Sequence, residues 1–148
     1  MTKSISPKNL VLYADDDPDD LVLVEQSFSL YSKNVEVITF KDGHNTITFL
    51  ERLPDGHPEP CLIILDINMP GLNGKDVLIR LRRLPRFQET PVVLFTTSSL
   101  PLDKEFALRY DAGFITKPLD LKQMELITYQ FIDHCHEEIK KKIRKEFL

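Results

Sequence analysis

The sequence predicts an α/β fold in three layers, with a parallel sheet covered by helices on both faces. Two observations support this prediction. Short apolar runs alternate five times with segments of helical periodicity. The runs Leu10–Ala14 and Pro91–Phe95 contain no charged residue, which is typical of strands buried on both faces. The 148 residues, 42% hydrophobic and 28% charged, suit one globular domain with a proper core.

The strands are predicted from apolar or β-branched runs bounded by acidic residues, proline or glycine. Leu10–Ala14 stops at three consecutive aspartates. Cys61–Asp66 lies between a proline-rich loop at residues 54–60 and the pair Pro70-Gly71. The five predicted strands are Leu10–Ala14, Val35–Phe40, Cys61–Asp66, Pro91–Thr96 and Phe114–Thr116.

Apolar residues at helical spacing predict a helix after each strand. The first is expected at Asp19–Tyr31, with Asp17 as its N-cap and Pro18 in its first turn. The others are expected at Asn45–Leu53, across Val77–Leu84 after an Asn73-Gly74 turn, at Leu102–Tyr110, and from Asp120 as a cap towards the chain end.

Bulk properties exclude several classes of protein. The net charge of −4 argues against nucleic-acid binding, which needs a basic face. No apolar run approaches the ~18–20 residues of a membrane span, and the polar N-terminus does not resemble a signal peptide. Cys61 and Cys135 are expected to be reduced thiols of a cytoplasmic protein.

Chemically active residues follow four of the predicted strands. Asp15 and Asp16 come after the first strand, Asp66 and Thr96 end the third and fourth, and Lys117 follows the fifth. Parallel strands end at one edge of a sheet, so these side chains are expected to converge. Two carboxylates ~4 Å apart repel by ~4 kcal/mol at a dielectric constant of ~20. The cluster therefore calls for a cation, and all-oxygen ligands favour Mg²⁺. Such a site suits a phosphoryl group.

Four segments, in order and at these strand ends, resemble the signature blocks of the CheY-like receiver domain of two-component response regulators, in its stand-alone form. The segments are Tyr13–Asp20, Leu65–Gly74, Phe95–Ser99 and Ile115–Pro118. The resemblance covers roughly residues 8–134. It implies a doubly wound, flavodoxin-like (βα)5 fold with strand order 2-1-3-4-5. The expected receiver domain spans residues 1–134.

The resemblance also implies residue roles. Asp66 would accept a phosphoryl group from a histidine kinase or a phosphotransfer protein. Asp16 and Asp66 would bind Mg²⁺ directly, Asp15 would help through water, and the backbone carbonyl of Asn68 would be a further ligand. Lys117 would pair with Asp66 and then with the phosphoryl group.

A conformational switch is implied as well. The Thr96 hydroxyl would turn towards the phosphoryl group, and Phe114 would pack into the space that it leaves. This changes the face formed by the fourth helix, the fifth strand and the fifth helix, which a downstream protein target would read. Pro118 matches a family proline that often follows a cis peptide bond.

The final helix is expected to continue beyond the receiver domain, through residues 135–148, with no separate output domain. One face of this helix is an apolar stripe, and the opposite face is basic at residues 140–145. We expect this helix to form a dimer or to dock a partner, in preference to a frayed helix end or contact with a membrane. A homodimer through the face of the fourth helix, fifth strand and fifth helix is the other expectation. The apolar stripe comprises Phe131, Ile132, Cys135, Ile139, Ile143 and Phe147.

The alternative function is that of a phosphatase of the haloacid dehalogenase type, which also forms an aspartyl phosphate on a parallel sheet. That family carries a D-x-D-x-T/V motif after its first strand. Residues 15–19 lack the threonine or valine, and no later Gly-Asp acidic block is present. The sequence therefore favours a signalling module over an enzyme.

Overall fold

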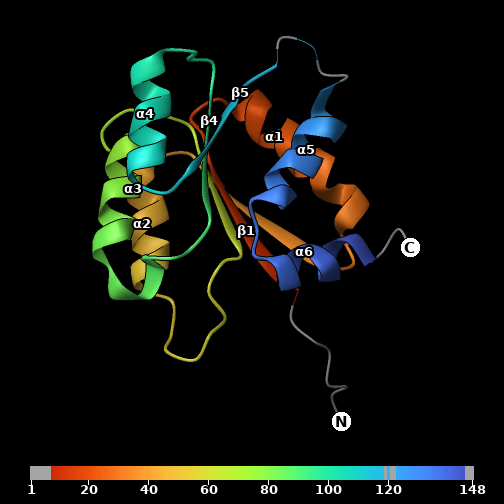
Figure 1. Ribbon diagram of the computed structural model, residues 1–148. Helices are drawn as coiled ribbons and strands as arrows, with labels where there is room; N and C mark the ends of the chain where they lie inside the picture. The colour runs from red at the N-terminus through yellow and green to blue at the C-terminus, as the bar shows by residue number, and fades with distance from the viewer. Residues whose placement is uncertain (1–7, 119, 121–122, 146–148) are drawn as a thin grey trace.

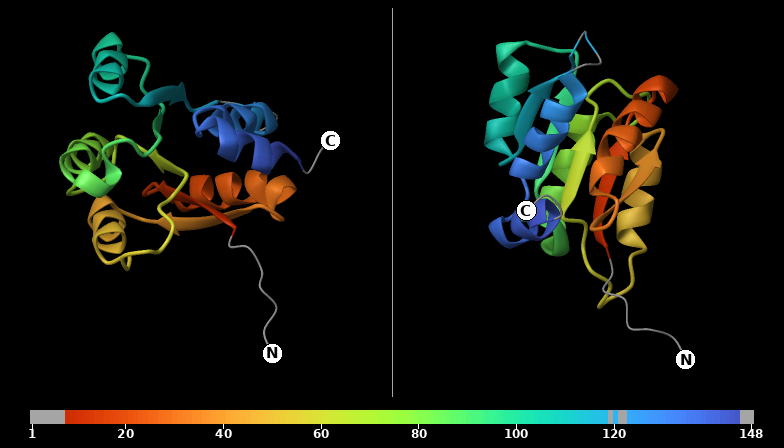
Figure 2. Two further views of the ribbon diagram at one scale, coloured as in Figure 1. Left: turned by 60° about the horizontal axis from the view of Figure 1, so that its bottom comes forward. Right: turned by 90° about the vertical axis from the view of Figure 1, so that its right-hand side faces the viewer.

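The computed structural model describes residues 8–118, 120 and 123–145. Five strands form one sheet in the order β2-β1-β3-β4-β5. Every neighbouring pair is parallel. Helices lie on both faces of the sheet (Figures 1 and 2). The predicted fold class and strand order are confirmed.

The predicted strands are all present, and their ends agree with the prediction to within one residue. The strands are β1 (Asn9–Ala14), β2 (Val35–Phe40), β3 (Leu62–Leu65), β4 (Val92–Thr96) and β5 (Gly113–Thr116). The α-helices are α1 (Pro18–Ser27), α2 (Gly43–Glu51), α3 (Gly74–Arg83), α4 (Pro101–Arg109), α5 (Met124–Asp133) and α6 (Glu137–Arg144). Short 3-10 helices cover Phe28–Tyr31 and Pro85–Phe87. Among the described residues, no helix is long and apolar enough to cross a membrane.

The sheet separates two hydrophobic clusters because successive side chains of a strand point to opposite faces. Tyr13 and Ile64 pack on the face covered by α1, α5 and α6. Leu12 and Leu94 pack on the face covered by α2, α3 and α4. Buried polar residues occupy the carboxyl ends of the central strands, at Asp15, Asp66 and Thr96.

The chain after β5 differs from the single long helix that the sequence predicted. The helix α5 begins at Met124, with Gln123 rather than Asp120 in the cap position, and it ends at Asp133. After a break at residues 134–136, α6 forms a separate helix. The prediction that residues 135–148 prolong one helix is therefore wrong for 135–145, the part of that range that the structure describes.

The helix α6 turns back beneath the amino ends of the strands and becomes part of the domain (Figure 1). Ile143 is completely buried, and Ile139 packs against the same cluster. The Asn34 side chain, just before β2, donates to the Lys142 carbonyl oxygen at 3.1 Å. Folding back buries apolar side chains that a protruding helix would expose to water. The apolar stripe therefore packs against the core of the same chain. Phe147, the last residue of the predicted stripe, lies outside the described residues.

Candidate functional site

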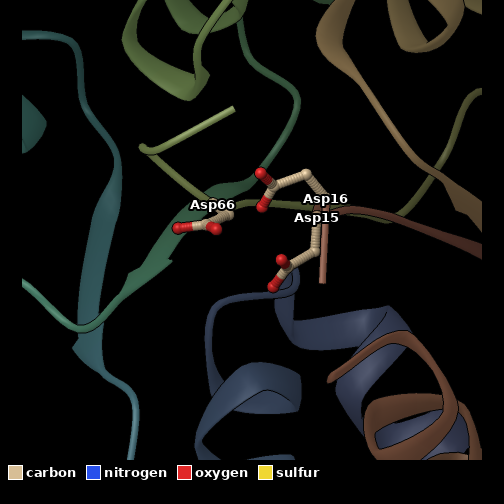
Figure 3. Close-up of side chains that lie close together, drawn as sticks. All are labelled: Asp15, Asp16 and Asp66. Carbon is tan, nitrogen blue, oxygen red and sulfur yellow. The ribbon is translucent and has the colours of Figure 1, made fainter. Parts of the chain in front are cut away.

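Main-chain hydrogen bonds bring the aspartates that follow β1 and β3 to the same level. The Asp66 N–H donates to the Ala14 carbonyl oxygen at 2.9 Å, and the Asp15 N–H donates to the Phe40 carbonyl oxygen at 3.0 Å. Carboxylate oxygens of Asp15, Asp16 and Asp66 lie within 4.8 Å of one another (Figure 3). The convergence of these acids, expected from parallel topology, is thus present.

Asp15 is the most completely hydrogen-bonded of these acids. Its side chain is fully buried. Its Oδ1 accepts the Asp17 N–H at 2.9 Å. Its Oδ2 accepts both the Tyr13 hydroxyl and the Lys117 ammonium, the latter at 2.7 Å. Asp16, in contrast, is exposed and forms the solvent side of the cluster.

The Lys117 ammonium lies among three carboxylates. Its Nζ is 2.7 Å from Asp15 Oδ2, 2.8 Å from Asp20 Oδ2 and 3.4 Å from Asp66 Oδ2. The contact with Asp66 is the longest of the three, so Lys117 pairs mainly with Asp15 and Asp20. The expected pairing with Asp66 is present only as this weaker contact.

The main chain at Lys117 is held by β4. The Lys117 N–H donates to the Thr96 carbonyl oxygen at 2.7 Å, which continues the pairing of β5 with β4 by one residue. The described residues contain no cis peptide bond, so Pro118 follows Lys117 through a trans bond. The expected cis bond is therefore wrong.

The charge balance of the site is visible in two pKa shifts. Burial, and then the negative charge of Asp15, raise the pKa of Asp66 to about 6. Burial alone would lower the pKa of Lys117, but its hydrogen bonds to Asp15 and Asp20 raise it above its usual value. An acid that resists ionisation beside a lysine indicates that one positive charge is too few for this cluster.

The loop from β3 to α3 passes close to Asp66 and fixes it. A Cβ on Gly74 would lie 2.2 Å from the Asp66 carbonyl oxygen, so only glycine fits there. The Gly74 N–H donates to the Ile67 carbonyl oxygen at 3.1 Å. Asn73 caps α3 through a reciprocal capping box with Asp76. The predicted turn at Asn73-Gly74 is therefore present, and it positions the carboxyl end of β3, where Asp66 lies.

Thr96 and Phe114 lie on the opposite face of the sheet from Lys117, towards α4. Leu94 pairs with Phe114 across β4 and β5, and both belong to the cluster beneath α4. Thr96, two residues after Leu94, is on that face too and is fully buried. Its Oγ1 accepts the Ser98 N–H at 3.3 Å. Phe114 is half-buried, which places an aromatic side chain diagonally beside the threonine.

The sequence matches the response regulator receiver domain over residues 11–128. The chain belongs to this family. The Synechocystis response regulator Rcp1 is 29% identical over 128 residues, which cover 84% of this chain and 86% of that protein. The membership leaves the haloacid dehalogenase alternative without support.

Solved receiver structures share the same architecture. The phosphorylated cyanobacterial phytochrome response regulator RcpA superposes with a TM-score of 0.75 at 26% identity, over 82% of this chain and 89% of that one. A Mn²⁺-bound form of Rcp1 superposes with a TM-score of 0.73 at 29% identity over the same shares. Vibrio cholerae CheY4 gives a TM-score of 0.68 at 26% identity, over 84% and 98%.

The oxygen-rich donor set of this receiver domain fits a hard divalent cation. The three carboxylates offer oxygen ligands, which Mg²⁺ prefers. The Asn68 N–H donates to Asp66 Oδ1 at 3.4 Å, and the role of the Asn68 carbonyl as a further ligand stays a prediction. The carboxylate oxygens of Asp15, Asp16 and Asp66 already lie within 4.8 Å of one another, so these side chains would hold one divalent cation between them. The three donors already bonded to Asp15 make Asp16 and Asp66 the more available ligands.

Two residues of the receiver site were not singled out from the sequence. Tyr13 precedes Asp15 by two positions, so strand alternation places both on one face and allows their hydrogen bond. Asp20 lies in the first turn of α1, next to buried Leu21, and reaches the lysine from there. The alternation of side chains along β1 could have identified Tyr13 as a neighbour of Asp15. The contact of Asp20 with the lysine could not be found this way, because it depends on how α1 packs against the sheet.

Proposed function

We propose that the protein is a response regulator whose receiver domain accepts a phosphoryl group on Asp66. The donor is a histidine kinase or a phosphotransfer protein, in the cytoplasm, and Mg²⁺ is required. The observation that carries the proposal is the position of Asp66: it is buried at the end of β3, its pKa is raised to about 6, and Asp15, Asp16 and Lys117 surround it.

The transfer needs an ionised acceptor and compensation for the charge that it gains. An oxygen of Asp66 forms a bond to phosphorus as the donor's phosphorus–nitrogen bond breaks, and the imidazole leaves with a proton. The Lys117 ammonium, 3.4 Å from Asp66, would donate a hydrogen bond to a phosphoryl oxygen. Bound Mg²⁺ supplies positive charge against the phosphoryl oxygens. The relatives support this reading, since RcpA was solved phosphorylated and Rcp1 with a divalent metal.

The output is proposed to pass through Thr96 and Phe114 to the surface of α4, β5 and α5. Both residues lie on the α4 side of the sheet, so a movement of the threonine reaches the half-buried ring directly. That surface exposes apolar side chains suited to a protein partner: Leu102 and Leu108 on α4 are 73% and 78% exposed, and Leu126 on α5 is 60% exposed. The partner is a downstream protein, or a second copy of this chain in a homodimer.

The test is incubation of the protein with Mg²⁺ and acetyl phosphate, followed by intact-mass spectrometry. We expect one added phosphoryl group, which is absent in Asp66→Asn and when EDTA replaces Mg²⁺. Asp55→Asn, in the exposed loop before β3, is the matched control and is expected to react like the wild type. Absence of the adduct in the wild type, or steady turnover of phosphate esters, contradicts the proposal.

A further inference from the structure

Asp20 contacts Lys117 without belonging to the acidic cluster. Its Oδ2 lies 2.8 Å from Lys117 Nζ, shorter than the 3.4 Å between Lys117 and Asp66. The cluster that can hold a cation comprises Asp15, Asp16 and Asp66. Among the contacts of the described residues, Asp20 therefore bonds to the site through the lysine, and nothing in the proposed chemistry requires it.

The position of Asp20 is set by α1 and does not depend on the strand ends. Asp17 caps the helix by accepting the Asp19 N–H at 2.9 Å, and Pro18 occupies the first turn. Leu21 and Val24 bury the adjacent stripe against the sheet. Asp20 is thus held on a rigid element that approaches Lys117 from the side of β1, while Asp66 approaches from β3.

An ammonium group has three N–H donors, and each is directed to a different carboxylate here. A phosphoryl group on Asp66 brings new oxygens that need one of these donors. Asp15 Oδ2 accepts both the Lys117 ammonium and the buried Tyr13 hydroxyl, whereas the Asp20 carboxylate is 29% exposed and can be rehydrated when it loses its partner. The contact with Asp20 is the one that the lysine can give up at lowest cost.

We infer that Asp20 is a positioning residue that restrains Lys117 on the α1 side and competes with the phosphoryl group on Asp66 for its ammonium. This inference rests on the proposed function of Asp66. Loss of the Asp20 charge lets the lysine move towards Asp15 and Asp66. Phosphoryl acceptance then becomes faster, while the lysine occupies more of the space and charge that a divalent cation needs.

The experiment compares Asp20→Asn with Asp19→Asn. Asp19 is the preceding residue in the same helical turn, is exposed, and is not one of the three carboxylates bonded to Lys117. Both variants remove one negative charge from the same helix end, so the change in net charge and in the interaction with the helix dipole is matched. Any difference between the two reports the contact with the lysine.

Two readouts are expected to move in opposite directions. The rate constant for phosphorylation by acetyl phosphate at saturating Mg²⁺ rises about threefold to fivefold in Asp20→Asn relative to Asp19→Asn, a factor in keeping with a partly exposed ion pair. The dissociation constant for Mg²⁺, from calorimetric titration without phosphodonor, rises by a similar factor. Asp20→Glu, which keeps the charge, is expected to stay near the wild type in both.

The outcomes separate this inference from the proposed function. If the wild type accepts no phosphoryl group, the proposed function fails, and the Mg²⁺ titration alone decides whether Asp20 restrains the lysine. If the wild type reacts and the two asparagine variants behave alike, the inference is wrong while the function stands. A slower reaction in Asp20→Asn also overturns it, because Asp20 would then aid phosphorylation instead of competing with it.

Discussion

Lys75 in α3 and Asp103 in α4 form an ion pair with Nζ and Oδ1 2.5 Å apart. The other oxygen of Asp103 accepts the Ser98 hydroxyl, in the loop that leaves β4. The Ser98 N–H in turn donates to Thr96 Oγ1. Lys75 also lies 5.2 Å from the ring centre of Phe106. One carboxylate thus ties two helices to the loop that begins at the proposed switch threonine.

Asp103→Asn is expected to loosen this connection and to destabilise the protein by about 1 kcal/mol at neutral pH. Hydrogen bonds from Lys75 and then Ser98 lower the pKa of Asp103 below its usual value. The stabilisation is therefore present above the unfolded-state pKa of 3.8 and disappears as the pH falls through the lower folded-state value. Urea unfolding of both proteins at neutral pH and at about pH 3 measures the difference. Glu105→Gln, on the exposed side of α4, is the control.

Ile143→Ala is expected to destabilise the domain by about 2–4 kcal/mol, because the side chain is completely buried between α6 and the sheet. Lys141→Ala, on the exposed side of the same helix, is expected to change stability by less than about 0.5 kcal/mol. Chemical denaturation measures both. Equal, small effects would show that α6 does not belong to the cooperative unit. A protein truncated after residue 134 should also lose stability, because it lacks the buried side chain of Ile143.

In EDTA, the ionisation of Asp66 is expected to work against folding. Its folded-state pKa of about 6 lies above the unfolded-state pKa of 3.8, so the native state holds the proton more tightly between these pH values. Ionisation of Asp66 does not change the free energy of unfolding below about pH 4, and it lowers that free energy as the pH rises towards about 6. Asp66→Asn should therefore exceed the wild type in stability at neutral pH, by about 1–2 kcal/mol, and match it in acid.

Adding Mg²⁺ provides the check on this pH effect. The cation compensates the carboxylates, so it should raise the melting temperature of the wild type at neutral pH more than that of Asp66→Asn. A wild type that is insensitive to millimolar Mg²⁺ would argue against a divalent site formed by these aspartates. Asp55→Asn again serves as the comparison, because its carboxylate is on an exposed loop.

The two cysteines are expected to react slowly with a soluble aromatic disulfide reagent. Both are free thiols; Cys135 is buried and Cys61 is half-buried. A hydrogen bond with Cys135, and then burial, raise the pKa of Cys61, which suppresses the reactive thiolate. Labelling should be complete at once in strong denaturant and limited by local opening in the native protein. A thiol that reacts at the rate of a free peptide cysteine would refute this description; single serine variants identify which one.

The sequence allowed the strands to be predicted closely because their signals are local. Runs such as Leu62–Leu65 are apolar throughout, and the acids that follow them mark the strand ends. Parallel topology then determines that Asp15 and Asp66 meet, since they follow adjacent strands of one sheet. Fold and approximate site were therefore accessible without any tertiary information.

What the sequence did not reveal depends on tertiary packing. The apolar stripe through Cys135, Ile139 and Ile143 has the same spacing in one long helix as in two shorter ones, so the reversal of direction before α6 left no periodic signal. Which carboxylates bond most closely to Lys117 likewise depends on how α1 packs against the sheet. Position along the chain identified the lysine; it did not identify which carboxylate the lysine prefers.

The placement of α6 has a practical consequence for biosensor design. The helix lies at the amino ends of the strands, and Asp16 opens to solvent at their carboxyl ends (Figures 1 and 3). A surface anchor or fluorophore attached at exposed Lys141 would lie at the end of the sheet opposite Asp66. Immobilised this way, the protein would leave the carboxyl edge of its sheet facing the solution, where the proposed phosphodonors and protein partners could be assayed in turn.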